Sequence, residues 1–249
     1  MEAQSNIKSF LEKFKSHYST VVRLKIDSDK AKFSELFSGW RTVDSSVLEY
    51  EKKSASDYNI FSILKNIANK ETITHSPFIA DLLNIKGQHK QGDLFYNEFL
   101  ERLDLGNNIG TYIPENKMFF TVETEKWTGD GSIDILISYR DSHKHFAIAI
   151  ENKIGAVDQP KQLERYYNYL KKIYKKNFLL IYLSPYGHPP VTPYSINEVL
   201  LEELKNTGVL KIISYSVQVR DVLQNTLQKI EADNVRPLAY QYLQIIKNL

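Results

Sequence analysis

A continuous apolar run that ends in charged residues places the strongest constraint on the fold of this chain. Residues 146–150 read FAIAI, and Glu151, Asn152 and Lys153 follow directly. An uninterrupted apolar run of this length suits a strand that is buried on both faces of a sheet. Because alternate side chains of a strand share a face, Glu151 and Lys153 should point to one side and Asn152 to the other.

Further strand patterns lie on both sides of this run. Residues 118–125 (MFFTVETE) and 132–139 (SIDILISY) alternate between apolar and polar side chains, and the turn-like sequences TGDG and RDSHKH follow them. We therefore expect a β-meander of three strands. A basic helix over roughly 158–175 should come next, and then a hydrophobic strand at 178–183. The proline-rich loop SPYGHPPVTP separates that strand from another one, expected at 209–215.

The first part of the chain, residues 1–105, has the pattern of helices. Apolar residues recur every three or four positions from Ile7 to Phe14 and from Ile60 to Ile67. Ser76-Pro77 is typical of a helix start, with Ser76 as the N-cap and proline in the first turn. These patterns predict an α/β protein with a mixed central sheet. We expect a single domain over residues 1–249, with a helical part at 1–105 and an α/β core at 106–249.

Composition sets outer limits on what this chain can be. Its 249 residues are 42% hydrophobic and 25% charged, which is the balance of a soluble globular protein. Without cysteine there can be no disulfide and no cysteine-bound zinc. The N-terminus lacks the apolar stretch of a signal peptide, and the longest apolar run is far shorter than the ~20 residues of a membrane span. We expect a cytoplasmic protein with no membrane contact.

Two carboxylates and a lysine form the chemical core of the sequence. Charged groups at a buried strand end are costly without partners, so Glu151 and Lys153 should meet an opposite charge. With Asp134 on the same face, the set could hold Mg²⁺ through oxygen and activate a water molecule for phosphodiester hydrolysis. Lys153 could orient or deprotonate that water, or neutralise charge on the phosphate. The alternative is a structural salt bridge between Lys153 and one acid.

These motifs resemble a known group of enzymes. Ile133-Asp134, followed after 16 residues by Glu151-Asn-Lys153, resembles the signature of the PD-(D/E)XK nuclease superfamily, although isoleucine stands where that signature has proline. IDILI, IENKI and DQPKQLERYYNYL resemble bacterial families of the superfamily that carry an IENK motif. THSPFIADLLN and GQHKQGDLFYNEFL resemble their helical segment. The resemblance covers about residues 70–215 and implies the restriction-endonuclease-like fold, with an αβββαβ core and here a helical N-terminal extension.

The resemblance also implies an activity and a cofactor. It identifies Asp134, Glu151 and Lys153 as the catalytic residues of a metal-dependent nuclease. Asp134 and Glu151 would then bind Mg²⁺ or Mn²⁺. The expected partner is nucleic acid, with DNA favoured over RNA. The sequence leaves undecided whether the protein forms a homodimer.

The helix after Lys153 carries a second motif of the resemblance. Gln162 and Tyr166 fit the QxxxY pattern of RecB-type members, and residues four apart share one helix face. The resemblance implies that this face contacts nucleic acid, together with the basic residues Lys161 and Arg165. More basic residues follow in the same helix and could contact phosphates or simply form a solvated face: Lys171, Lys172, Lys175 and Lys176.

Weaker signals leave their alternatives open. Glu71 and His75 could share a helix face near the site, or His75 could have a capping or packing role. Glu123 and Glu125 could supply a third metal ligand or could be exposed strand acids. No phosphate-binding GxxxxGK[ST] loop occurs in the sequence.

The favoured interpretation is a metal-dependent nuclease that hydrolyses phosphodiester bonds of DNA. By analogy of fold, such a protein would serve phage defence, restriction or repair. The first alternative is a catalytically inactive module that binds nucleic acid. The second is a non-enzymatic interaction or sensor protein of a defence system.

Overall fold

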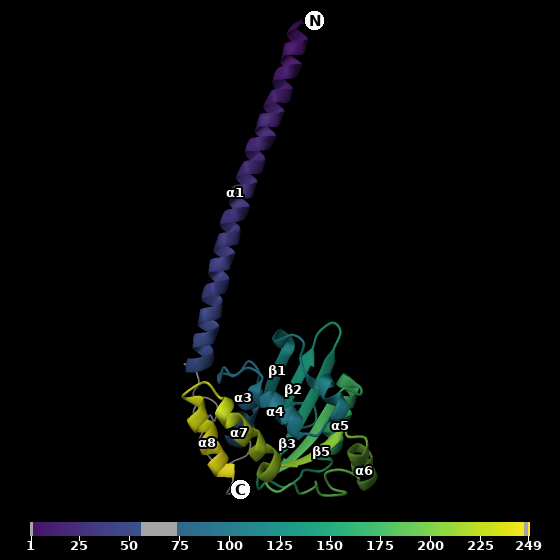
Figure 1. Ribbon diagram of the computed structural model, residues 1–249. Coiled ribbons are helices and arrows are strands. Elements are labelled where there is room, and N and C mark those ends of the chain that lie inside the picture. The colour runs from purple at the N-terminus through teal and green to yellow at the C-terminus, as the bar shows by residue number, and fades with distance from the viewer. Residues whose placement is uncertain (1, 56–73, 247–248) are drawn as a thin grey trace. The chain divides into compact units, whose positions relative to one another are not determined.

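The computed structural model describes residues 2–55, 74–246 and 249. The chain divides into two compact units, Met1–Tyr50 and Glu51–Leu249. One long helix, α1, with bounds Glu2–Ser54, forms the first unit and ends a few residues into the second. The second unit contains a sheet with helices on both faces (Figure 1). No helix in the described part of the chain combines the length and the apolar character needed to cross a membrane.

The sheet has five strands in the order β1-β2-β3-β4-β5. The first three strands pair antiparallel as a meander, and β3, β4 and β5 pair parallel. The strand bounds are β1 Phe120–Trp127, β2 Ser132–Arg140, β3 His145–Asn152, β4 Phe178–Ser184 and β5 Leu210–Ser214. The expected meander and the mixed central sheet are therefore confirmed.

Two hydrophobic cores lie on opposite faces of the sheet because strand side chains alternate. In β3, Ile148 and Ile150 face one core, while Ala147 and Ala149 face the other. The first core is covered by helices from both ends of the second unit: α3 (Ser76–Leu83), α4 (Leu94–Arg102), α7 (Arg220–Thr226) and α8 (Val235–Ile246). The second core lies under α5 (Gln162–Tyr174) and α6 (Glu198–Asn206), which are drawn to the right of the sheet in Figure 1.

Short helical turns complete the second unit. Their bounds are η2 Gly106–Tyr112, η3 Lys117–Phe119, η4 Tyr215–Val219 and η5 Leu227–Lys229. The α/β class is confirmed, and the order of helix, three strands, helix and strand is the core order expected from the sequence. The helical N-terminal part is confirmed in α1, α3 and α4. The apolar pattern from Ile60 to Ile67 and the acid Glu71 lie outside the described residues.

The predicted N-cap role of Ser76 is wrong. Thr74 and His75 already form a helical turn, and His75 occupies the N-cap position with helical backbone angles. Ser76 is buried inside the first turn, where its hydroxyl accepts a hydrogen bond from Asn152 Nδ2 at 3.0 Å. The serine therefore makes a tertiary contact instead of a local cap, while Pro77 lies in the first turn as expected.

Helix α5 begins at Gln162, about four residues later than the start near residue 158 that was expected for this basic helix. Lys161, just before it, has a left-handed backbone with a φ of 53°. Asp158 is held against other elements, since its carboxylate accepts hydrogen bonds from the Tyr182 hydroxyl and the Val191 backbone N–H. The chain turns through these residues before the helix can start.

Candidate active site

The end of β3 carries a buried ion pair. Lys153 Nζ lies 2.6 Å from Glu151 Oε1, and the two side chains are 8% and 1% exposed. Period-two alternation places both on the face covered by α5, as the sequence predicted. A lysine and a glutamate this deeply buried must compensate each other, because a single buried charge would cost several kcal/mol.

Asp134 lies beside this pair on the neighbouring strand. Strands β2 and β3 place Ile135 opposite Ile150, and Asp134 and Glu151 are the next residue of each strand beyond that pair. Residues opposite each other in an antiparallel pair share a face. Asp134 is buried, and its Oδ2 accepts a hydrogen bond of 2.6 Å from the Asn152 backbone N–H. The structure thus brings Asp134, Glu151 and Lys153 together at one end of the sheet.

Gln162 and Tyr166 reach this cluster from α5. Gln162 Nε2 donates to Glu151 Oε1 at 2.7 Å and to the Tyr166 hydroxyl at 3.3 Å, and its Oε1 accepts from the Gln159 backbone N–H. The Tyr166 hydroxyl donates to the Ser132 carbonyl oxygen at the start of β2. Burial raises the pKa of Tyr166, and the charges of Glu151 and Asp134 raise it further. Both side chains therefore face the carboxylates from within the protein, and neither is exposed.

A network on the opposite face of β3 fixes the same strand end. Asn152 donates to Ser76 Oγ at 3.0 Å and accepts from the Tyr215 hydroxyl at 3.1 Å. Sequence reasoning placed Asn152 on this face but assigned it no partner. Ser76 and Tyr215 are both distant from Asn152 in the sequence, so their contacts with it could not be foreseen. The sequence signal for this network is Asn152 itself, a polar residue at the end of a buried strand.

Asp158 anchors the loop between β3 and α5, although the sequence alone assigned it no role. Asp158 Oδ1 accepts from the Tyr182 hydroxyl at 3.0 Å, and its Oδ2 accepts from the Val191 N–H at 2.7 Å. Tyr182 lies opposite Glu151 in the β3–β4 pairing. Asp158 therefore ties this loop to the strand that borders the ion pair.

The two predicted basic contacts at the start of α5 differ in exposure. Lys161 is exposed. Arg165 is largely covered, and its guanidinium lies 3.8 Å from the Asp130 carboxylate and 3.2 Å from Gln159 Oε1. Gly131, with a φ of +113°, makes room for it, since a Cβ there would lie 3.3 Å from Arg165 Nη2. Arg165 thus ties α5 to the turn between β1 and β2.

The remaining basic residues lie at the other end of α5. Lys171, Lys172, Lys175 and Lys176 are all exposed. Thirteen positions separate Gln162 from Lys175, which corresponds to about 20 Å along a helix axis. Lys171 Nζ donates to the Tyr167 hydroxyl at 3.0 Å and lies 5.1 Å from the centre of that ring. These lysines form a positive surface remote from Glu151.

The residues with weaker sequence signals do not lie in the cluster of Asp134, Glu151 and Lys153. His75 lies on the other side of the sheet, where its Nδ1 is 2.9 Å from the Tyr242 hydroxyl, and burial lowers its pKa to about 4. Glu123 is exposed and paired with Lys126 at 2.8 Å. Within the described residues, no group of three or more acidic or histidine side chains is arranged to hold a metal, so neither Glu123 nor Glu125 completes such a set.

The donor set of the cluster nevertheless suits a magnesium ion. Mg²⁺ is usually bound through one or two carboxylates and keeps water or substrate phosphate as its other ligands. Asp134 and Glu151 supply two hard oxygen donors from adjacent strands. The chain contains no cysteine that would favour a softer metal. The residues present therefore fit a divalent cation with oxygen ligands.

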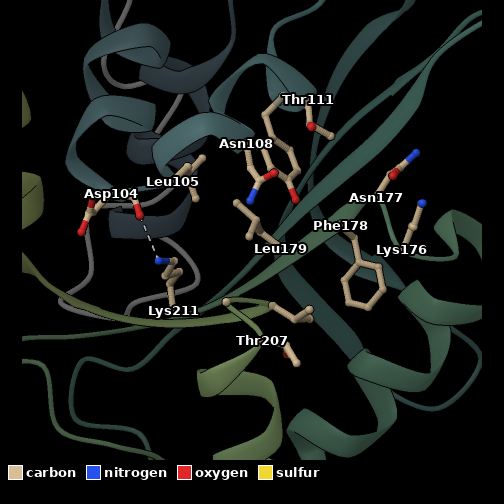
Figure 2. Close-up of a pocket in the computed structure, with 13 residues that line it drawn as sticks. Asp104, Leu105, Asn108, Thr111, Lys176, Asn177, Phe178, Leu179, Thr207 and Lys211 are labelled. Carbon is tan, nitrogen blue, oxygen red and sulfur yellow. Dashed lines mark hydrogen bonds between the residues drawn. The ribbon is translucent and has the colours of Figure 1, made fainter.

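A cavity of about 410 Å³ lies away from these carboxylates. Its lining includes Lys176 and Phe178 near the start of β4 and Lys211 in β5, whereas Glu151 is at the far end of β3. In Figure 2, Lys211 points toward Asp104 and donates to its backbone oxygen at 3.2 Å. The cavity shares no residue with the cluster, so it is not the candidate active site.

Comparison with known proteins agrees with this geometry. Residues 58–245 match a protein family described as the PD-(D/E)XK nuclease superfamily, and this range includes every strand of the sheet. No curated protein and no solved structure matches the chain. The match extends over most of the 249 residues, so this chain belongs to the PD-(D/E)XK nuclease superfamily.

Proposed function

We propose that this protein is a metal-dependent nuclease that hydrolyses phosphodiester bonds of DNA. The observation that carries the proposal is the 2.6 Å contact between Lys153 and Glu151, next to the Asp134 carboxylate. A salt bridge built only for stability would need one acid. Here two acids and one lysine meet at the end of a buried strand, where desolvation makes them costly, and costly clusters of this kind are concentrated at functional sites.

Each residue of the cluster has a distinct task in this proposal. Asp134 and Glu151 would hold Mg²⁺ or Mn²⁺, which when bound stabilises negative charge on the phosphate and makes water more acidic. Lys153 places a positive charge beside the reacting phosphate and orients the attacking water through its ammonium group. Gln162 fixes the Glu151 carboxylate, and Tyr166 fixes Gln162 against β2.

The distribution of charge supports a nucleic-acid substrate. Lys161 is exposed next to the cluster, and the lysines at the C-terminal end of α5 lie about 20 Å farther along the helix. At a rise of about 3.4 Å per nucleotide, this distance corresponds to roughly six nucleotides. Phosphates on one side of the cut would then contact these lysines, which supply affinity without sequence preference.

A cleavage assay with purified full chain tests the proposal. Linear, circular and single-stranded DNA, and the corresponding RNA, are incubated with Mg²⁺, Mn²⁺ or EDTA. We expect cleavage of DNA that needs the cation and is lost in Asp134→Asn and in Lys153→Met. Lys205→Met, on the exposed face of α6, removes the same charge elsewhere and should cleave normally.

The controls separate the proposal from its alternatives. Lys153→Arg keeps the charge but not the shape, so residual cleavage there and none in Lys153→Met assigns Lys153 an electrostatic task. Nucleic-acid binding without cleavage under every condition would favour an inactive binding module. Absence of both binding and cleavage would contradict the proposal and favour an interaction protein.

A further inference from the structure

Helix α1 exposes a continuous line of large apolar side chains. In its first half, Ile7, Leu11, Phe14, Tyr18 and Val22 follow one another in steps of three or four residues. All five are exposed, with Phe14 at 58% and Tyr18 at 63%. Steps of three and four keep side chains on one side of a helix, so these residues form a single stripe.

The stripe continues through the second half of the helix. Ile26 extends it, Asp29 interrupts it once, and the same spacing then resumes to the end of the first unit. The members of this second half are Phe33, Leu36, Trp40, Val43, Val47 and Tyr50. We call the whole line, residues 7–50 at these positions, the apolar seam of α1. Its steps alternate between three and four residues, which is the heptad spacing of a coiled coil, except that three steps of four follow one another from Phe14 to Ile26 and add one residue to the repeat there.

Most of the stability of a helix with such a seam comes from packing of its apolar face against a partner. Exposed Trp40, at 73%, and Phe14 are the side chains that most favour burial. A two-stranded coiled coil directs about four of every seven positions to its partner, so residues 7–50 would offer roughly 25 positions. A standard protein interface uses about 20–30 residues per side, so the seam is long enough for a stable dimer.

The distribution of charged side chains along α1 favours a second copy of the same helix, running antiparallel, as its partner. Residues 7–25 contain five basic side chains and one acidic: Lys8, Lys13, Lys15, Arg23, Lys25 and Glu12. Residues 26–50 contain three basic side chains and five acidic, which are Asp27, Asp29, Glu35, Asp44 and Glu49. Two parallel copies would place basic halves side by side. Two antiparallel copies place each basic half against an acidic half.

The heptad spacing is also consistent with antiparallel pairing. When Ile7 of one copy faces Val47 of the other, Leu11 faces Val43 and Phe14 faces Trp40, so apolar positions coincide in the outer parts of the seam. At the centre, the same register places Lys25 opposite Asp29 of the other copy, and Val22 opposite Lys32. In this register Asp44 lies between Lys8 and Lys15 of the second copy. We propose that α1 pairs with α1 of a second copy of this chain as an antiparallel coiled coil, so that the assembly carries two copies of the Lys153 cluster.

The oligomeric state of the full chain provides the first test. Light scattering coupled to size exclusion should give twice the mass of one chain. Phe14→Glu and Trp40→Glu, which place a charge in the seam, should weaken the dimer by about a hundredfold or more. Ser16→Glu and Ser45→Glu lie on the outer side of the same helix and should leave the mass unchanged. A wild-type monomer at micromolar concentration overturns the proposal, as does a dimer that both seam variants retain.

Engineered cysteines test the direction, since the chain has none of its own. A disulfide needs Cα atoms within about 7 Å, so only facing positions can be joined. Ile7→Cys mixed with Val47→Cys should give a cross-linked heterodimer under oxidation, and each variant alone should give little. Efficient cross-linking of Ile7→Cys to itself would show parallel helices and overturn the antiparallel arrangement. Because these readouts need no cleavage, they are independent of the nuclease proposal.

Discussion

The amide of Gln162 donates a 2.7 Å hydrogen bond to Oε1 of Glu151, the same oxygen that lies 2.6 Å from Lys153 Nζ. One carboxylate oxygen is therefore fixed from two directions, by a helix on one side and by its own strand on the other. This arrangement leaves the orientation of Glu151 dependent on α5, and it makes Gln162 a positioning residue in the proposed nuclease.

Replacement of Gln162 should lower the rate of cleavage while the fold survives. In Gln162→Ala the Glu151 carboxylate loses one fixed donor, so we expect a roughly 10- to 100-fold loss of activity, as for other residues that orient metal ligands. The rate should recover in part at higher Mn²⁺ concentration, which a purely structural defect would not produce. Asn168→Ala removes an exposed amide from the same helix and should have no effect.

A double-mutant cycle should detect the buried ion pair in the free energy of unfolding. Lys153→Met removes the ammonium beside Glu151 and should destabilise the protein by about 3 kcal/mol, because the glutamate stays buried. The double variant Glu151→Gln, Lys153→Met should recover much of that loss, since neither member of the ion pair then carries a charge. Chemical denaturation measures the free energy of unfolding of each variant. Additive losses in the double variant would mean that the two side chains are not coupled.

Asn152 should stabilise the active end of β3 from the opposite face of the sheet. Asn152→Leu leaves Ser76 Oγ and the Tyr215 hydroxyl without this partner inside the core, so we expect a loss of about 2 kcal/mol. Cleavage should fall as well, because the same backbone carries Glu151 and Lys153. Asn206→Leu, at an exposed position of α6, is the matched control for the melting temperature.

Two buried histidines should make stability depend on pH below neutrality. Burial lowers the pKa of His75 and of His89 from 6.5 to about 4. Between these values the unfolded chain binds protons that the folded chain excludes, so the free energy of unfolding rises with pH through this window. Each histidine contributes up to about 3 kcal/mol, at 1.36 kcal/mol per unit of pKa. Their contribution is fully present above pH 6.5 and is lost as pH falls toward 4.

The carboxyl group of Asp81 has the opposite effect on the pH dependence of the free energy of unfolding. Burial raises its pKa from 3.8 to about 6, so the folded chain holds a proton there that the unfolded chain releases, and stability falls as pH rises through that range. His75→Gln should therefore remove most of the rise between pH 4 and 6.5, because the remaining contributions of His89 and Asp81 are similar in size and opposite in sign. Thermal melting across this range measures the slope, with exposed His188→Gln as the control. An unchanged slope in His75→Gln would contradict the assignment.

The lysines at the end of α5 should govern how salt affects DNA binding. Each phosphate contact that is lost should reduce the slope of log affinity against log salt concentration by about 0.9 for duplex DNA. The quadruple variant with Lys171, Lys172, Lys175 and Lys176 changed to Ala should bind more weakly and show a flatter slope. A duplex too short to reach about 20 Å beyond the cut should not distinguish it from the wild type. If the quadruple variant keeps the wild-type slope on long DNA, the phosphates lie elsewhere.

Local patterns in the sequence were sufficient to determine most of the elements of this protein. Period-two alternation placed Glu151 and Lys153 on one face of a buried strand and Asn152 on the other, and apolar spacing marked the helical first part. These features depend on neighbours a few residues apart, so no tertiary information is needed. The family was also carried by short motifs around Asp134 and Glu151, and the match over residues 58–245 agrees with it.

Only the tertiary structure decided which atoms meet. Ser76 follows the local signature of a cap, yet its hydroxyl bonds to Asn152, which is 76 positions away. Gln162 and Tyr166 share a helix face in any helix, but whether that face meets solvent or the carboxylate depends on how α5 packs on β3. A side chain's direction within an element follows from backbone geometry, whereas its partner follows from the packing of distant elements, which no local spacing encodes.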